Sequence, residues 1–399
     1  MRVRRCANLI IEPREALAFD LDSLAGGGDG LNTRLSLLAL APHLQQEIDV
    51  SADEVAALAA IPCTAWTSLE MLEPQHGATL LRGLLDKGLL VSDTADGAAV
   101  RERDDLLRAA NWRSLSAAQH YFSRWHDVRS GDDSQRTGYL TLRELIGKLG
   151  DPPPPSQQRV ARHAQLGLPR PELGAFDALL RRRATCRNFD SAATLSQMHF
   201  AQMLQRVFSA NGTLAVDGDE AHAVIKRSSP SGGGLHPTEA YLLVQRVEGL
   251  ASGLYHYRPV EHALEPLQAL DAAGAADLAL RSVAAQTWFA NAPVLVVLVS
   301  RFPRSFWKYR NHAKAYRVVT LDVGHLSQTL YLSATDLGLG AFITAAINEG
   351  EIEQAFGLDP LVESAMAVCG FGVRGPNCDT PEFDPTHAVW RADGTRIAD

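Results

Sequence analysis

Residues Ser228–Glu239 read Ser-Ser-Pro-Ser-Gly-Gly-Gly-Leu-His-Pro-Thr-Glu and lead directly into the apolar run Ala240–Val244. Three consecutive glycines between two prolines predict a loop, because glycine costs backbone entropy in a helix or strand and proline lacks an N–H donor. A loop without Cβ atoms lets backbone groups approach a flat or anionic ligand closely. The stretch is therefore either a cofactor cradle or an ordinary tight surface turn.

The residues around this loop predict an α+β domain, with a central mixed sheet flanked by helices, over 171–399. The expected strands are 241–244, 293–300, 342–344 and 365–369, and the expected helices are 173–182, 196–208, 318–337 and 351–357. The run 294–299 is apolar without alternation, as in a central strand covered on both faces. Residues 254–257 and 263–267 predict a hairpin.

The N-terminal region, 1–128, predicts a small winged-helix-like unit. Ser51–Glu54 is a candidate helix cap, 79–87 is an amphipathic helix, and 89–92 is a short strand. Two basic residues, Arg82 and Lys87, are few for phosphate contacts, so a peptide-binding or structural unit is favoured over a DNA reader. Residues 107–127 predict one aromatic docking helix whose rings are core.

Residues 129–170 predict a proline-rich linker, because Asp151 precedes four prolines, Pro152–Pro155, and polyproline is stiff and extended. It would join the N-terminal region to the main domain.

Composition limits the classes of function. The 399 residues carry a net charge of −8, which argues against nucleic acid as the main partner. The five cysteines are scattered and signal neither a disulfide framework nor a metal site. No apolar run is long enough to span a membrane, and no signal peptide is recognised, so we expect a cytoplasmic protein.

Two further clusters could carry chemistry. If residues 183–187 are extended, Arg183, Thr185 and Arg187 project from one side, a set that suits a phosphate monoester; the alternative is a basic helix C-terminus that complements the dipole. The adjacent Lys308 and Tyr309 are either a solvated helix start or an acid–base pair tuned by burial.

These segments together resemble a known family. In order, the chain carries Arg183-x-Thr185-x-Arg187-x-Phe189, the loop Pro230–Glu239, Gly253–Tyr257, Lys308-Tyr309, Gly324-His325 with Gln328, and Leu337–Gly340. The set resembles the nitroreductase-like FMN flavoprotein superfamily, and within it the SagB-type, or azoline dehydrogenase, branch that matures ribosomally made peptides. The resemblance covers roughly residues 173–374.

The resemblance implies a homodimer with FMN at the interface. It assigns cofactor binding to one set of positions, namely Arg183, Thr185, Arg187, Ser231, Gly232, Gly233, Gly340, Ala341 and Arg374. It assigns catalysis to Lys308 and Tyr309, which would take the α-proton of a thiazoline or oxazoline while hydride leaves for the flavin. A cyclodehydratase or another maturation enzyme is an expected partner, and oxygen the expected reoxidant.

Alternatives remain at this point. The same fold can reduce dehydroamino acids or nitroaromatics with NAD(P)H. A degenerate flavin fold could instead be a scaffold that binds a leader peptide without catalysis. A DNA-binding regulator is disfavoured by the acidic charge and the sparse cations of the wing.

Overall fold

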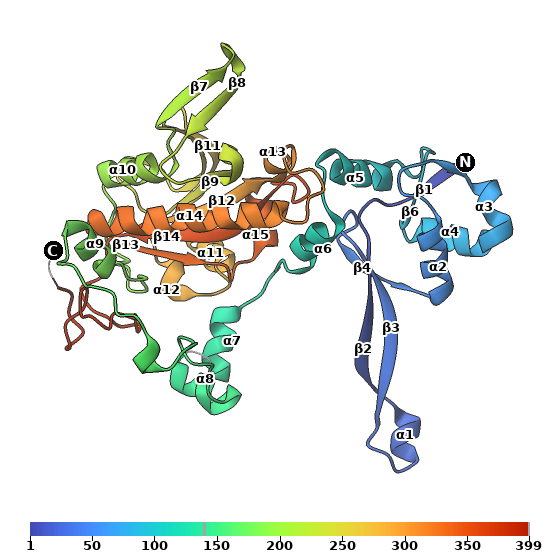
Figure 1. The fold of residues 1–399 in the computed structure, drawn as a ribbon, viewed down its shortest axis with the longest axis horizontal. Coiled ribbons are helices and arrows are strands. Elements are labelled where there is room, and N and C mark those ends of the chain that lie inside the picture. The colour runs from blue at the N-terminus through green and yellow to red at the C-terminus, as the bar shows by residue number, and fades with distance from the viewer. Residues whose placement is uncertain (139–140, 398–399) are drawn as a thin grey trace. The chain divides into compact units, whose positions relative to one another are not determined.

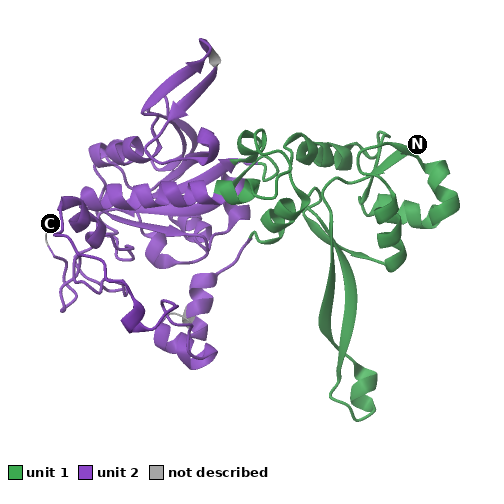
Figure 2. Ribbon diagram, viewed as in Figure 1, with its two compact units in different colours: residues 1–124, 301–319, 359–364 green, residues 125–300, 320–358, 365–399 purple. Residues whose placement is uncertain are grey.

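The computed structural model describes residues 1–138 and 141–397, which form two compact units (Figure 2). Unit 1 comprises Met1–Arg124, Arg301–Val319 and Asp359–Ser364, and unit 2 comprises Trp125–Ser300, Thr320–Leu358 and Ala365–Asp399. Neither unit is continuous in sequence. Two segments from the second half of the chain therefore complete the N-terminal unit.

Unit 2 is built on a six-stranded sheet in the order β11-β10-β9-β12-β14-β13 (Figure 1). The strands are β9 Thr238–Val244, β10 Gly253–Arg258, β11 Ala263–Ala269, β12 Val294–Arg301, β13 Gly340–Thr344 and β14 Glu363–Gly372. The predicted hairpin of β10 and β11 is antiparallel and in register from Gly253 to Arg258 apart from one bulge. All four predicted strands of the main domain are confirmed.

Helices cover both faces of this sheet. On one face lie α10, Gln197–Phe208, and α14, Ala315–Asp336; on the other lie α11, Ala272–Ser282, α12, Thr287–Ala290, and α15, Glu349–Phe356. Alternate residues of β12 enter the two cores, Val294, Val296 and Leu298 on one side and Leu295, Val297 and Val299 on the other. This double burial is the reason that β12 lacks polar alternation.

Three smaller elements of unit 2 frame the motifs. Helix α9, Ala175–Arg182, ends where the arginine-bearing segment begins. A hairpin of β7, Gly212–Val216, and β8, Asp219–Lys226, precedes the glycine loop, which contains a 3₁₀ turn at Gly232–Gly234. Residues 375–397 follow β14 as a tail of turns and isolated bridges.

The segment predicted as a linker is partly helical. Residues 130–149 form α7, Ser130–Thr137, and α8, Leu142–Leu149, on either side of the two residues outside the described range. A capping box between Thr141 and Glu144 begins α8. Residues 150–174 are exposed throughout and contain one 3₁₀ turn, Arg162–Ala164. The stiff, extended linker expected of the proline run stays a prediction.

The N-terminal part of unit 1 packs helices on short strands. Strands β1 Arg2–Arg5, β5 Thr67–Ser68 and β6 Leu90–Ser92 form a sheet in the order β5-β1-β6, with helices α2 Ala52–Ala60, α3 Leu69–His76 and α4 Ala78–Asp86. Ser51 and Glu54 form the expected capping box at the start of α2. Leu58, Leu81 and Leu84 join this core.

The sequence did not predict the long ribbon of unit 1. Strand β2, Ile10–Phe19, pairs with β3, Leu31–Ala41, over its whole length, and β3 also pairs with β4, Gln46–Val50. The short helix α1, Leu21–Ala25, lies at the tip, where Asp20 caps its first turn.

The aromatic helix predicted at 107–127 is instead two helices, α5, Ala98–Ala109, and α6, Ser114–Phe122. Asn111 adopts the left-handed region at φ 59°, which ends α5. The expected core role is confirmed for Trp112, His120 and Tyr121, which are buried, but not for Trp125, which is exposed. Trp112 packs 4.6 Å from Phe302 and 4.7 Å from Phe306, centroid to centroid. Helix α13, Phe302–Phe306, is thereby fixed within unit 1.

Candidate functional site

Residues 183–189, the arginine strip, run in extended form beside β13. Thr185 forms an isolated parallel bridge with Ala341, and the N–H of Cys186 donates to the carbonyl of Ala341 over 2.8 Å. Gly340 lies so close that a Cβ there would meet Cys186 Sγ at 2.5 Å and Arg374 Cγ at 2.9 Å. The strip, Gly340, Ala341 and Arg374 are therefore brought together, and packing alone requires glycine at 340.

Tyr331 on α14 fixes the start of the strip. The Arg183 guanidinium lies 5.4 Å from the centroid of the Tyr331 ring, a cation–π contact. The Tyr331 hydroxyl shares a 3.0 Å hydrogen bond with Thr185 Oγ1 and accepts the N–H of Ile343 over 3.1 Å. Burial raises the pKa of the Tyr331 phenol, which keeps it neutral. Sequence reasoning missed this residue.

The second half of the strip is held by a buried carboxylate. Glu382 has no exposed side-chain surface, and its Oε2 accepts from Arg374 Nη1 over 2.6 Å and from Trp390 Nε1 over 2.9 Å. Its Oε1 accepts the N–H groups of Arg187 and Asn188 over 2.6 and 3.1 Å. The Arg187 guanidinium donates to the carbonyl of Pro381 over 2.7 Å. The structure thus directs Arg183 and Thr185 to α14 and Arg187 to the tail.

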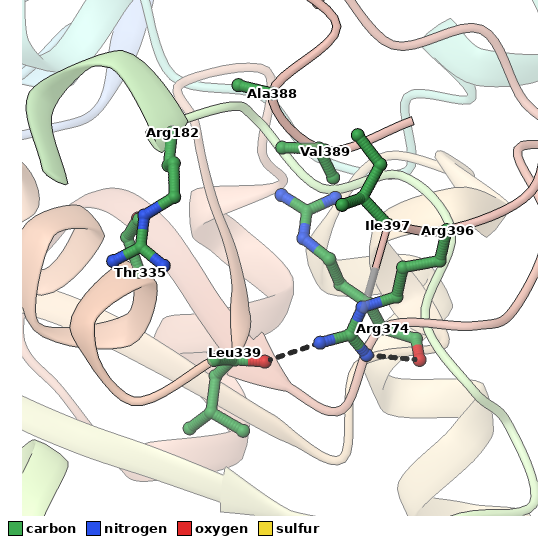
Figure 3. Close-up of a pocket in the computed structure, with 9 residues that line it drawn as sticks. Arg182, Thr335, Leu339, Arg374, Ala388, Val389, Arg396 and Ile397 are labelled. Carbon is green, nitrogen blue, oxygen red and sulfur yellow. Dashed lines mark hydrogen bonds between the residues drawn. The ribbon is translucent and has the colours of Figure 1, made fainter. Parts of the chain in front are cut away.

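An arginine-lined pocket adjoins the strip (Figure 3). It is small, with a volume of about 30 Å³, and its lining includes Arg182, Arg374, Arg396 and Thr335. Arg396 donates to the carbonyls of Gly338 over 3.1 Å and Arg374 over 3.5 Å, which holds its guanidinium at the pocket. Three guanidiniums around one space suit a dianionic phosphate. Arg182 and Arg396 were not among the predicted binding residues.

Asp322 of α14 anchors the glycine loop, residues 228–239. Asp322 is buried, and its Oδ2 accepts the Ser231 hydroxyl over 2.5 Å while Oδ1 accepts the Gly232 N–H over 2.9 Å. Ser231 Oγ in turn accepts the N–H of His236 over 2.9 Å. The Ser231 hydroxyl is thus turned into the protein, where it holds the loop rather than lining an open surface. Sequence reasoning missed Asp322.

Part of the glycine loop is solvent-exposed main chain without side chains. Gly233 and Gly234 are exposed and adopt positive φ values of 66° and 68°, a conformation that favours glycine. A Cβ on Gly234 would meet nothing within 4 Å. The loop therefore presents open main chain against which a flat ring can lie.

The two groups lie apart within one chain. From β9, which follows the glycine loop, the sheet continues through β12, β14 and β13 to the strip, four spacings or roughly 19 Å. On α14, the anchors Asp322 and Tyr331 are nine residues apart, about 13 Å along the axis and on opposite sides of the helix. One chain therefore presents two separate half-sites.

Lys308 and Tyr309 belong to unit 1, so they are described apart from these half-sites. They follow α13 in a turn where the N–H of Tyr309 donates to the carbonyl of Ser305 over 3.3 Å. Lys308 Nζ lies 5.7 Å from the centroid of the Tyr309 ring. Lys308 is exposed and Tyr309 is half-buried, so both remain accessible to a ligand.

The remaining observations concern metal-ligating side chains, cysteines and helix hydropathy. Across residues 1–138 and 141–397, no three His, Cys, Asp or Glu side chains gather in a way that could hold a metal ion. The five cysteines are free thiols, and burial raises the pKa of Cys186 to about 12 although Arg374 is near. Within the same ranges, no helix is both long and apolar enough to cross a bilayer.

The fold and these residues define an α+β domain that offers a cationic pocket and an open glycine backbone. A family model described as the nitroreductase family matches residues 180–373. MJ1384 of Methanocaldococcus jannaschii, described as a putative nitroreductase, is 30% identical over 183 residues, which cover 46% of this chain and 84% of that protein. The chain belongs to the nitroreductase family, so the predicted family and fold class are confirmed.

Two further relatives are named as processing proteins. The trifolitoxin-processing protein TfxB of Rhizobium leguminosarum bv. trifolii is 32% identical over 144 residues, covering 36% of this chain and 38% of TfxB. The microcin B17-processing protein McbC of Escherichia coli is 27% identical over 154 residues, covering 37% of this chain and 54% of McbC. The match thus spans about half or less of these two proteins. They agree with the predicted peptide-maturation branch.

Among solved structures, the Escherichia coli microcin synthetase McbBCD complex with truncated pro-MccB17 bound matches with a TM-score of 0.47 and 20% identity. The match covers 68% of this chain and 94% of the matched chain. The winged-helix character expected of residues 1–128 stays a prediction.

Proposed function

We propose that this chain is an FMN-dependent oxidoreductase that acts in the maturation of a ribosomally synthesised peptide, oxidising azoline rings to azoles. Membership of the nitroreductase family and the peptide-processing names of TfxB and McbC support the class of reaction. The observation that carries the cofactor is the pairing of a three-arginine pocket with an open glycine backbone. The residues present fit a flat ring that bears a phosphate.

In this proposal the cationic half-site holds the phosphate end of FMN. Arg182 and Arg396 face the pocket, and Arg183 and Thr185 of the strip contact Tyr331 of α14. Arg374 is already paired with the buried carboxylate of Glu382, which compensates its charge. Arg374 therefore contributes mainly to the shape of the pocket. Arg187 is bound to the tail and would support the strip rather than contact the phosphate directly.

The glycine half-site would contact the ring system, with the backbone of Gly233 and Gly234 as the contact surface. Because the half-sites lie roughly 19 Å apart in one chain, we propose that each cofactor is enclosed by the strip of one copy and the loop of another. A two-fold homodimer would then form two equivalent sites. Sedimentation of the FMN-bound protein tests this arrangement, and a monomeric flavoprotein would contradict it.

When bound, FMN supplies a two-electron acceptor for the hydride that leaves the ring carbon of the azoline. Lys308 and Tyr309 are the proposed groups that take up the accompanying α-proton, which balances the loss of two hydrogens from the substrate. Their exposed turn leaves them open to a peptide. We also propose a cyclodehydratase as the partner that supplies the azoline, and a cytoplasmic location for the protein.

The first test is the visible spectrum of the purified protein and its titration with FMN. Bound flavin is expected, and Arg396→Ala should weaken FMN retention, measured by equilibrium dialysis, while the exposed Arg136→Ala should leave it unchanged. A thiazoline-containing peptide should then lose two hydrogens by mass spectrometry. Lys308→Ala with Tyr309→Phe should keep the flavin spectrum and lose turnover; an active double variant would contradict the assigned base.

A second candidate is reduction of nitroaromatics or dehydroamino-acid residues with NAD(P)H. The match to MJ1384, described as a putative nitroreductase, favours it. Stopped-flow mixing of the flavin-loaded protein with NADPH separates the two: rapid bleaching supports the reductase, whereas bleaching only by the thiazoline peptide supports the dehydrogenase.

A further inference from the structure

The ribbon formed by β2 and β3 has an apolar face that the described part of the chain leaves uncovered toward the tip. The register pairs Phe19 with Leu31, Leu17 with Thr33 and Glu15 with Leu35. Directly paired residues of antiparallel strands project from the same face. Leu17, Phe19 and Leu35 on this face are 73%, 71% and 66% exposed.

The same face continues into the core of unit 1. Leu37 and Ala39 follow on β3, and Ala39 is fully buried against the cluster that includes Leu58 and Leu81. The inner half of the face is thus covered by helices, and the outer half is not. A two-stranded ribbon is marginally stable by itself, and a contiguous exposed apolar surface marks an interaction site.

The opposite face of the ribbon needs no partner. It carries Glu12 and Arg14, and the Arg14 guanidinium donates to Glu12 over 2.8 Å and to Glu47 of β4 over 2.7 Å. Charges on that side therefore compensate one another. The outer half of that face carries Ala16, Ala18, Asn32 and Arg34, so the large apolar side chains of the paired strands project from the other face.

The uncovered face is bordered by negative charge. From 15 to 35 the chain has four acidic residues, Glu15, Asp20, Asp22 and Asp29, and one basic residue, Arg34, which projects from the opposite face. At the tip, Gly30 lies between Leu24 and Phe19: a Cβ there would be 3.2 Å from Leu24 and 3.5 Å from Phe19. The tip helix thus extends the apolar surface beside the acids.

We propose that the outer half of the ribbon, residues 15–35, docks a cationic, leucine-rich polypeptide segment. The acidic border attracts a basic partner and repels an anionic lipid surface or a nucleic acid. It also opposes face-to-face pairing of two copies, which would bring eight carboxylates together. Six large apolar side chains of this segment are 48% to 73% exposed, namely Leu17, Phe19, Leu21, Leu24, Leu31 and Leu35. At roughly 100 Å² each they offer about 600 Å², near one side of a standard interface. The proposal does not rest on the flavin assignment.

The test uses the full chain and two synthetic peptides, one alternating leucine with lysine and the other leucine with glutamate. Fluorescence anisotropy should show at least tenfold tighter binding of the lysine peptide, weakened by salt. Leu17→Ser with Leu35→Ser should weaken it about tenfold or more. Ala16→Ser, which places a hydroxyl on the opposite face, should leave it unchanged.

A second measurement keeps the proposal testable if the serine variant disturbs the ribbon. Glu15→Gln with Asp22→Asn changes exposed carboxylates alone and should lower both affinity and salt dependence, and hydrogen exchange should show residues 15–35 protected by the lysine peptide. Equal affinity for the two peptides, or binding that both variants leave intact, would overturn the proposal. Self-association of the wild type that Leu17→Ser with Leu35→Ser abolishes would assign the face to a second copy and also overturn it.

Discussion

The arginine strip and the glycine loop flank the same helix, α14, yet they are stabilised in opposite ways. The strip is closed: a buried carboxylate from a distant part of the chain pairs with Arg374 and with the backbone of Arg187. The loop is open: Asp322 anchors it at Ser231 and Gly232, and Gly233 and Gly234 remain exposed. The guanidiniums of Arg183 and Arg187 therefore contact α14 and the tail, whereas the glycine loop keeps part of its main chain exposed.

Glu382→Gln should produce the largest effect, because it leaves the Arg374 guanidinium buried without a counter-charge. We expect a loss of about 3 kcal/mol in the free energy of unfolding, measured by urea denaturation. Asp336→Asn is the matched control, since it breaks an exposed pair with Arg206 and should cost less than about 1 kcal/mol. Equal costs would show that the strip does not depend on its buried pair.

Asp322→Asn should have the next largest effect and should be local to the glycine loop. The carboxylate loses its charge-assisted bonds to Ser231 and Gly232, which we expect to cost about 2 kcal/mol. Hydrogen exchange should rise at residues 229–236 and stay unchanged at 183–189. Faster exchange in both segments would contradict the independence of the two half-sites.

Tyr331→Phe tests the side of the strip that faces α14. It removes the hydroxyl shared with Thr185 and leaves the N–H of Ile343 without its acceptor, at an expected cost of about 1–2 kcal/mol. The ring under Arg183 is kept, so FMN retention should change little. Strong loss of FMN would mean that the hydroxyl itself contacts the ligand.

The smallest expected effect is a pH dependence of the free energy of unfolding. It arises at His256, whose partner Glu239 is the last residue of the glycine loop. Hydrogen bonds to Glu239 and Glu265 raise the pKa of His256 above its ordinary value of 6.5. The protonated imidazole thus contributes stability fully below pH 6.5, and this contribution is lost as the pH rises through the higher folded-state pKa. Urea midpoints from pH 6 to 9 should fall more steeply in the wild type than in His256→Gln. His222→Gln, at an exposed pair with Asp219, should keep the wild-type slope.

The local sequence predicted most of unit 2, because its strands and helices carry clear apolar periodicity and its turns carry glycine and proline. The sequence did not predict the side-chain contacts that hold the half-sites. Asp322, Tyr331, Glu382 and Arg396 stand in no recognisable motif, and their partners lie far away in the chain. The ribbon was missed because β2 contains Pro13 and the helix-favouring run Glu15–Ala18. Cross-strand pairing with β3 overrides that local preference.

Unit 1 is completed by Arg301–Val319 and Asp359–Ser364, and Trp112 holds both segments through its ring and through a hydrogen bond to the carbonyl of Leu361. The region before residue 125 is thus no detachable module. A shortened chain that starts near residue 171 would lay bare Phe302, Phe306 and Tyr316, and we expect it to aggregate. Exchange of the N-terminal region between proteins would accordingly require matching changes in the two interior segments, so the two parts are expected to diverge together.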